Sequence, residues 1–333
     1  MLLNKNIKIL INYLFGPLVF ILLLVSIYHQ LHERNGWQAS FHQFRHAIAD
    51  TNNRYKLALV FLLMIGNWGL EARKWQLSMR PVQRLSWWRS FQATLTGSTI
   101  ASFTPNRTGE YLGRMLFLEE SSRISSVSLT ILCSLSQNIM TMGMGCAGIL
   151  YFLGHLSALP KADGENLRLW LQVLLFLVGA LMAAATVFYF RLSWLRIVLK
   201  ALRLPDKYLV YVKILEDVDT NILFIILVLS LFRYSIFILQ YGLMFSVCGV
   251  NLNLSQTFGS MSVVFLVMAI IPTFTLLTEL GLRWEVSLQL VQLFSDRAMG
   301  ILACSFGIWL VNLVIPAFVG GLLILRVKLF RNK

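Results

Sequence analysis

Long apolar runs divide the chain into segments of the length that crosses a bilayer. About 20 mostly apolar residues are needed to span the hydrocarbon core as a helix. The pattern predicts six such helices, at residues 9–28, 57–79, 125–153, 169–190, 222–247 and 301–325. The first is expected to be a retained anchor, because it is too long for a signal peptide and lacks a small-residue cleavage site.

Two further stretches, residues 88–118 and 258–293, are apolar at both ends and polar in the middle. Pro105 and Gly109 interrupt the first, and Pro272 and Gly281 interrupt the second. A single lipid-facing helix would not tolerate proline together with ionised side chains. Each stretch is therefore predicted to be a re-entrant hairpin of two short helices. Irregular backbone at membrane depth must be covered by protein or line a cavity, so the hairpins mark an interior site.

Composition agrees with a membrane protein, since 57% of the 333 residues are hydrophobic and only 13% are charged. The formal charge is +14, and basic residues gather at 5–8, 73–89, 191–213 and 326–333. All four clusters fall on one side if both hairpins return to the face they entered from. Short cytoplasmic loops collect Lys and Arg, which predicts cytoplasmic termini and a multi-pass protein of the cell membrane, in a bacterium the inner membrane.

This topology makes two halves of the chain inverted relative to each other. The first unit covers residues 57–153 with hairpin 88–118, and the second covers residues 222–325 with hairpin 258–293. Inverted repeats with broken helices near the midplane are typical of transporters. The expected fold is an all-α polytopic membrane protein, with residues 1–333 forming a single transmembrane domain.

The residues that could bind a lipid head group lie in the hairpins. Glu110 and Arg114 are four positions apart and would share one helix face. A guanidinium presents a planar fork suited to phosphate, so Arg107 or Arg114 is a candidate ligand of a lipid phosphodiester. The alternative is a structural ion pair that stabilises the hairpin and binds no ligand.

The second hairpin repeats this spacing with Glu279 and Arg283. Glu285 adds a negative charge that could attract the ammonium of a head group, or it could simply face water. Intramembrane ionisable groups are functional candidates by default, so all three residues are predicted head-group contacts.

Charged residues outside the hairpins are interpreted as structural. Glu71, Arg73 and Lys74 close the second span and are expected to be interfacial anchors, with a cavity-lining role for Glu71 as the lesser alternative. Arg233 and Gln240 lie within an apolar span and are expected to make packing hydrogen bonds, with a transport role as the lesser alternative.

The run Thr104-Pro-Asn-Arg-Thr-Gly-Glu-Tyr-Leu-Gly-Arg114 resembles a signature of the lysylphosphatidylglycerol synthase transmembrane-region family. Ile271-Pro-Thr followed by Glu279-Leu-Gly-Leu-Arg283 is similar to that family's second signature. The resemblance implies a flippase-like module, which in the best-understood members moves an aminoacylated phospholipid between leaflets. Other relatives are linked to polyprenol-phosphate or glycolipid pathways.

Two features depart from the resemblance. The soluble aminoacyl-transferase domain of two-part members is missing, so lipid synthesis is not expected here. The span after the first hairpin carries Ser136, Gln137 and Asn138 where many relatives have ionisable residues.

Three functions therefore stand: a lipid flippase, a membrane-embedded enzyme on a lipid phosphate or lipid-linked sugar, and a non-catalytic membrane partner. The enzyme would need Glu110 or Glu279 as its general acid or base, and the flippase is favoured because no catalytic motif is recognisable. The sequence has no phosphate-cradling glycine loop, and its four cysteines lie in or beside apolar spans, so no cofactor or metal is expected. Expected partners are anionic or aminoacylated phospholipids or polyprenol-phosphate-linked lipids, a second copy or a lipid-synthesising enzyme, and no nucleic acid.

Overall fold

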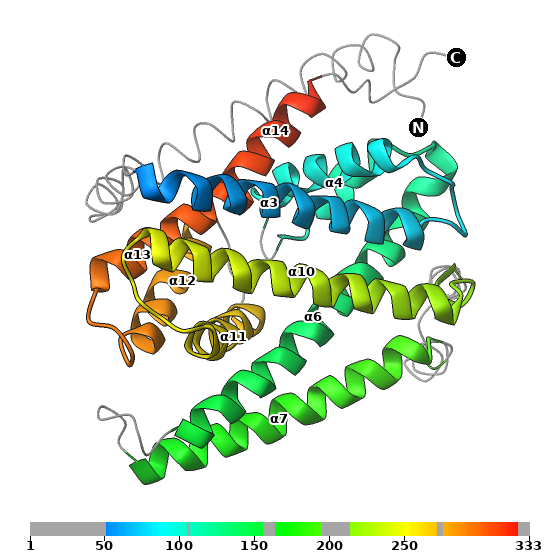
Figure 1. Cartoon of the computed structure of the whole chain (residues 1–333). Helices are drawn as coiled ribbons and strands as arrows, with labels where there is room; N and C mark the ends of the chain where they lie inside the picture. The colour runs from blue at the N-terminus through cyan, green and yellow to red at the C-terminus, as the bar shows by residue number, and fades with distance from the viewer. Residues whose placement is uncertain are drawn as a thin grey trace.

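The described part of the protein is helical. The computed structural model describes residues 51–104, 107–155, 164–192, 194, 214–271 and 276–325, and these contain no strand. Its elements (Figure 1) are α3 (Thr51–Ser78), α4 (Trp87–Ala101), α5 (Glu110–Met115), α6 (Glu120–His155), α7 (Gly164–Phe190), α10 (Thr220–Val247), α11 (Leu254–Ile270), α12 (Leu276–Val291), α13 (Ala298–Trp309), the π-helix η4 (Leu310–Val314) and α14 (Ile315–Ile324).

Five helical segments in the described residues are long and apolar enough to cross a membrane. They are Asn53–Ser78, Glu120–His155, Asn166–Phe190, Thr220–Val247 and Ala298–Ile324. Each coincides with one of the predicted spans, and the predicted span at residues 9–28 lies outside the described residues. The protein is thus an all-α membrane protein with several transmembrane helices.

Helices α3 and α10 run antiparallel, side by side, through the middle of the molecule (Figure 1). Lys56 Nζ, near the start of α3, donates to Ser246 Oγ at the end of α10, over 2.7 Å. Gln240 Nε2 is buried and donates to Val60 O over 3.0 Å. The hydrogen bond expected from Gln240 therefore joins the two helices.

The broken segment between α3 and α6 leaves and returns to the same end of the bundle. The backbone N–H of Glu119, just before α6, donates to Gln83 Oε1 in the turn after α3, over 3.2 Å. The segment between α10 and α13 does the same at the opposite end, because a Cβ on Gly300 in α13 would stand 2.8 Å from Cys248 O. Each pair of short helices is therefore flanked in sequence by two long helical segments, and the ends of these segments that adjoin the pair lie close together.

Helix α5 folds back against α4. Ser86 caps α4 by accepting a hydrogen bond from Arg89 N, and the helix ends at Ala101, shortly before Pro105. A Cβ on Gly113 would stand 2.6 Å from Gly97 Cα, so the two helices cross backbone to backbone. Glycine at the crossing is what allows this approach.

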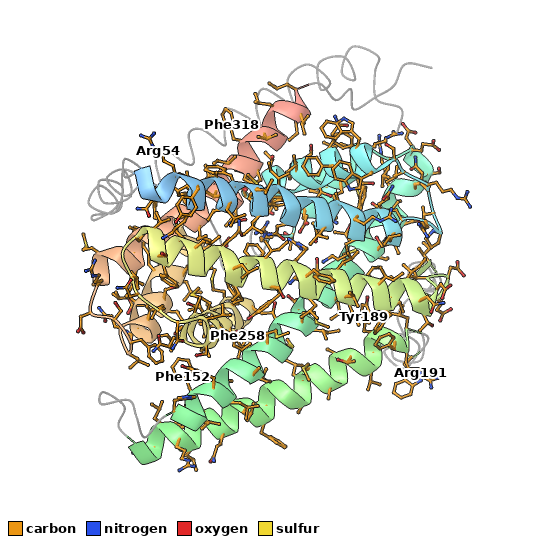
Figure 2. The ribbon with its side chains drawn as sticks, in the orientation of Figure 1. Arg54, Phe152, Tyr189, Arg191, Phe258 and Phe318 are labelled. Carbon is orange, nitrogen blue, oxygen red and sulfur yellow. The ribbon has the colours of Figure 1, made fainter. Side chains whose placement is uncertain are left out.

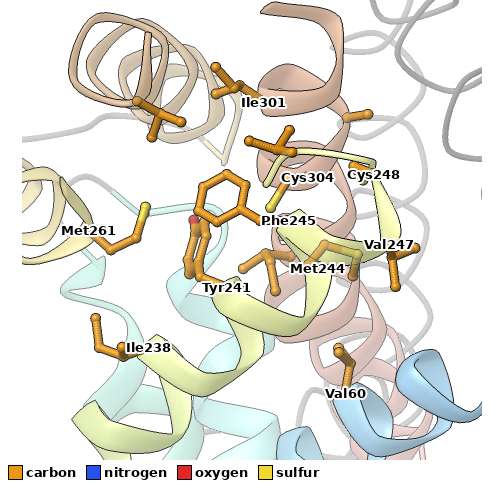
Figure 3. Packing of buried hydrophobic residues seen from close by; sticks show 14 of the residues in the cluster. Val60, Ile238, Tyr241, Met244, Phe245, Val247, Cys248, Met261, Ile301 and Cys304 are labelled. Carbon is orange, nitrogen blue, oxygen red and sulfur yellow. The ribbon is translucent and has the colours of Figure 1, made fainter. Parts of the chain in front are cut away.

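The largest apolar core lies around α10 (Figure 3). Tyr241 and Phe245 of α10 are buried with their rings 5.8 Å apart. Met261 of α11 and Ile301 and Cys304 of α13 are fully buried in the same cluster. This core fixes α10 against the second pair of broken helices.

The last span contains one turn of π-helix, η4. Before this turn α13 packs on α12, and after it α14 packs on α4. Thr99 Oγ1 of α4 donates to Ala317 O of α14 over 2.6 Å. One span therefore contacts both broken segments, each through a different part of its length.

Gly320→Ala is expected to lower the free energy of unfolding by about 1–3 kcal/mol, the usual cost of overpacking. A Cβ on Gly320 would stand 2.2 Å from Leu95 O and 2.4 Å from Thr99 Oγ1, so α14 must move away from α4. Unfolding by SDS titration of the purified protein measures the change. Gly179→Ala is the matched control, because a Cβ there meets nothing within 4 Å. Equal losses in both variants would contradict the close α4–α14 contact.

Candidate functional site

Glu71 is the centre of a buried ionic cluster. Its side chain lies in α3, and the residue is 5% exposed. Glu71 Oε1 accepts a hydrogen bond from Arg114 Nη2 of α5 over 2.7 Å, and Oε2 lies 3.0 Å from Lys74 Nζ. Arg233 Nη1 of α10 also binds Oε2. A buried carboxylate is costly unless paired, and here three cations from three helices pair with it.

Arg114 joins this cluster to the first broken segment. It is 0% exposed, binds both Glu71 and Glu110, and its guanidinium carbon lies 5.6 Å from the centroid of a Trp75 ring. A Cβ on Gly97 would stand 3.1 Å from Arg114 Cγ, so α4 leaves just enough room for this side chain. Arg114 Nε and Nη1 are buried without a hydrogen-bond partner among the described residues. Buried donors of this kind call for a further partner, which bound water or an anionic group would supply.

Arg233 is held by neutral polar groups as well as by Glu71. Its Nε donates to Asn67 Oδ1 over 2.8 Å, and its Nη1 donates to Gln137 Oε1 over 3.3 Å. Gln137, in the polar run at residues 136–138 of α6, therefore takes part in the network. Its neighbour Asn138 is exposed.

A serine pair extends the network from Lys74. Lys74 Nζ donates to Ser230 Oγ over 3.3 Å, and Ser230 Oγ lies 2.9 Å from Ser136 Oγ. The whole cluster contains three cations and two carboxylates, those of Glu71 and Glu110. Its net charge is therefore +1, which favours an anionic ligand.

A second buried ion pair lies in α12. Arg283 Nη2 binds Glu279 Oε1 over 2.8 Å, and Arg283 Nη1 donates to Tyr241 OH of α10 over 2.9 Å. Arg283 Nε is buried and has no hydrogen-bond partner in the described ranges. This pair is neutral, unlike the cluster around Glu71.

Helix α10 connects the two ionic groups. Arg233 binds the first group and Tyr241 binds the second. These residues are eight positions apart, which corresponds to about 12 Å along the helix axis. The two Glu/Arg pairs thus lie at different heights along one helix.

The remaining predicted site residues lie outside these two groups. Arg107 is half-buried and has a positive φ of 58°. Gly109 precedes α5, and its N–H donates to Thr104 Oγ1 over 2.6 Å. Gly281 lies within α12, so the helix is not interrupted there. Glu285 is exposed and accepts a hydrogen bond from Gln289, and Pro105 and Pro272 lie outside the described residues.

The interpretation of Glu71 and Lys74 as interfacial anchors is wrong, because both are buried. Arg73, between them, is exposed as an anchor should be. A signal was present in the sequence: Asn67, Glu71 and Lys74 are spaced by four and then three residues, so they share one face of α3. A polar stripe inside an apolar span indicates a face that meets protein rather than lipid.

The comparisons with known proteins identify the family. The sequence profile described as lysylphosphatidylglycerol synthase TM region matches residues 9–276. This match contains the first signature and the cluster around Glu71, and it ends before Glu279 and Arg283. No curated protein matches the chain. Because the profile covers most of the sequence, the chain belongs to the lysylphosphatidylglycerol synthase TM region family.

Proposed function

We propose that the protein moves a phospholipid or lipid-linked intermediate between the two leaflets of the cell membrane in the manner of a flippase. Membership of the family already implies a membrane protein whose partners are membrane lipids. The observation that carries the proposal is Arg114, fully buried with two donors that have no partner in the described structure. A lipid phosphate offers the oxygens that these donors lack.

In the proposed mechanism the head group enters the bundle while the acyl chains stay in lipid. A net charge of +1 around Glu71 favours a phosphate over a neutral or cationic group. Arg233, bound to the same carboxylate, is the second candidate ligand of the phosphate. The neutral Glu279–Arg283 pair, about 12 Å away along α10, is proposed to contact the rest of the head group.

Several features support an inverted repeat around this site. Helices α3 and α10 end at Ser78 and Val247, 169 positions apart. The Glu110–Arg114 and Glu279–Arg283 pairs are separated by the same 169 positions. Helix α4 packs on α14, and α11 packs in the same way on α6. We propose that α4–α5 and α11–α12 are re-entrant hairpins that dip into the bilayer from opposite faces.

The proposed orientation places the α3–α4 turn in the cytoplasm. Arg80, Arg84 and Arg89 lie in or beside this turn, and Arg191 lies at the same end of the bundle (Figure 2). Cytoplasmic loops are enriched in such residues, so both termini are proposed to be cytoplasmic as well.

The test is transport in liposomes with trace fluorescent phosphatidylglycerol, followed by dithionite quenching of the outer leaflet. The wild-type protein is expected to expose inner-leaflet lipid to quenching. Arg114→Lys is expected to lower the rate by at least about tenfold, because lysine keeps the charge but loses the fork that binds phosphate. Arg168→Lys is the control, since Arg168 is exposed at the start of α7.

Three outcomes are distinguishable in the same liposomes. Movement of unmodified lipid that depends on Arg114 supports transport. A chemically altered lipid on thin-layer chromatography would instead favour a membrane-embedded enzyme. Quenching no faster than in protein-free liposomes, with every lipid of the panel (phosphatidylglycerol, its lysyl ester and a polyprenol phosphate), would contradict the proposal and favour a non-catalytic partner.

A further inference from the structure

A pocket of about 410 Å³ lies at the turn between α3 and α4, apart from the buried cluster. It is lined by Gln76, Arg80, Arg84 and Leu85. Its volume is within the range of small-molecule sites, about 300–1,000 Å³. Arg80 and Arg84 are exposed, and neither has a carboxylate within ion-pair distance in the described ranges. The pocket therefore presents two guanidinium groups to whatever enters it.

The surroundings of the pocket are strongly basic. Residues 72–109 contain no Asp or Glu, and Arg73 and Arg89 are exposed on either side of the two lining arginines. Glu71 and Glu110, which border this stretch, are paired within the ionic cluster. The exposed acidic residues that come near the turn are Glu119 and Glu120, whose segment meets it through Gln83. Four exposed arginines against these two glutamates leave the turn positive, which favours an anionic occupant.

Hydrogen bonds fix the shape of the pocket without using the two arginines. Gln76 Nε2 donates to Leu85 O over 2.8 Å, and Gln76 Oε1 accepts from Arg73 Nη1 over 2.6 Å. Within the turn, Gln83 N donates to Met79 O over 2.8 Å. The walls are thus held in place while both guanidinium groups stay available, which lowers the entropic cost of binding.

An exposed aromatic group follows the pocket-lining Leu85 in the chain. Trp87 and Trp88 are 44% and 57% exposed, and both stack on Phe91, at ring distances of 5.2 and 5.7 Å. Trp87 reaches along α3, since its Cζ2 lies 3.6 Å from where a Cβ on Gly69 would stand. Exposed Trp in a membrane protein marks the level of the lipid head groups. The pocket therefore opens at the membrane surface, at the height of lipid phosphates.

We infer that this pocket binds the phosphate of an anionic phospholipid from the adjacent leaflet, as a resident lipid distinct from the transported one. Arg80 and Arg84 donate to the phosphate oxygens, and the glycerol and acyl chains lie against the Trp87–Trp88–Phe91 group. The inference goes beyond translocation, because it assigns a second lipid site that requires neither Arg114 nor Glu71.

Native mass spectrometry of the whole protein in detergent tests the inference, with phosphatidylglycerol and phosphatidylcholine of identical acyl chains as probes. The wild type is expected to bind phosphatidylglycerol more tightly. Arg80→Gln with Arg84→Gln is expected to weaken the tightest phosphatidylglycerol binding by about 30-fold, the combined effect of two arginines at an anionic surface. Binding of phosphatidylcholine should change little.

The matched control is Arg54→Gln with Arg168→Gln, which removes two exposed charges elsewhere and gives the same net charge. Arg54 lies at the other end of α3 (Figure 2). Unchanged lipid binding in this control, with loss in the pocket variant, supports the site. Equal binding in both double variants, or equal binding of the two lipids to the wild type, would overturn it. Displacement of the lipid by millimolar inorganic phosphate would overturn the lipid assignment in favour of a soluble anion.

Discussion

Replacing Glu71 with glutamine is expected to lower the free energy of unfolding by about 3–5 kcal/mol, the cost of removing one partner of a buried ion pair. Glu71 is the carboxylate shared by Lys74, Arg114 and Arg233. Without it Glu110, which pairs with Arg114, is the one carboxylate left in the cluster, whose net charge rises from +1 to +2. SDS-titration unfolding of the purified variant measures the loss, and lipid movement in liposomes should fall with it.

A second substitution separates charge balance from packing. Adding Lys74→Met to Glu71→Gln returns the cluster to a net charge of +1, so the double variant is expected to be more stable than Glu71→Gln alone. Glu285→Gln is the control, because Glu285 is exposed and surface changes of this kind stay within about 0.5 kcal/mol. A Glu71→Gln variant that unfolds like this control would show that the cluster does not stabilise the fold.

Arg283→Met is expected to be destabilising to a similar extent, about 3–5 kcal/mol. The change leaves Glu279 buried without its cation and removes the donor to Tyr241 OH. SDS-titration unfolding of Arg283→Met measures the loss. The double variant Glu279→Gln with Arg283→Met is measured beside it.

The double variant should recover most of the loss, because replacing both members of a buried pair with neutral side chains of similar volume is often close to neutral. If the single and double variants unfold alike, the loss comes from the packing of Arg283 rather than from an unpaired carboxylate. That result would contradict the ion-pair argument for the second group.

Contacts within one helix could be predicted from the sequence. Glu110 and Arg114, and likewise Glu279 and Arg283, are four positions apart, and helix geometry alone brings such side chains together. The span positions were equally accessible, because the apolar runs fix them. Re-entry of the hairpins into a bilayer and the contacts of their side chains with a head group stay predictions.

Contacts between helices could not be predicted in this way. Arg233 and Glu71 are 162 positions apart, and they meet only because α3 and α10 pack antiparallel with particular faces inward. Apolar content shows that a helix crosses the membrane but says little about its rotation when nearly every side is apolar. Glu71 and Arg233 were also interpreted separately from the sequence, Glu71 as an interfacial anchor and Arg233 as a packing residue.

The π-helical turn η4 determines which neighbouring helices the last span can contact at the same time. In an uninterrupted α-helix each residue advances the direction of the side chains by about 100°. A π turn has i→i+5 hydrogen bonds and more residues per turn, so each of its residues advances that direction by less. Winding Leu310–Val314 as regular α-helix with no residue removed would therefore turn α14 relative to α13. Gly320 would then no longer face Leu95, although α13 kept its place on α12. The π turn thus accommodates about one extra residue, and relatives that keep both contacts without this turn should have one residue fewer between them.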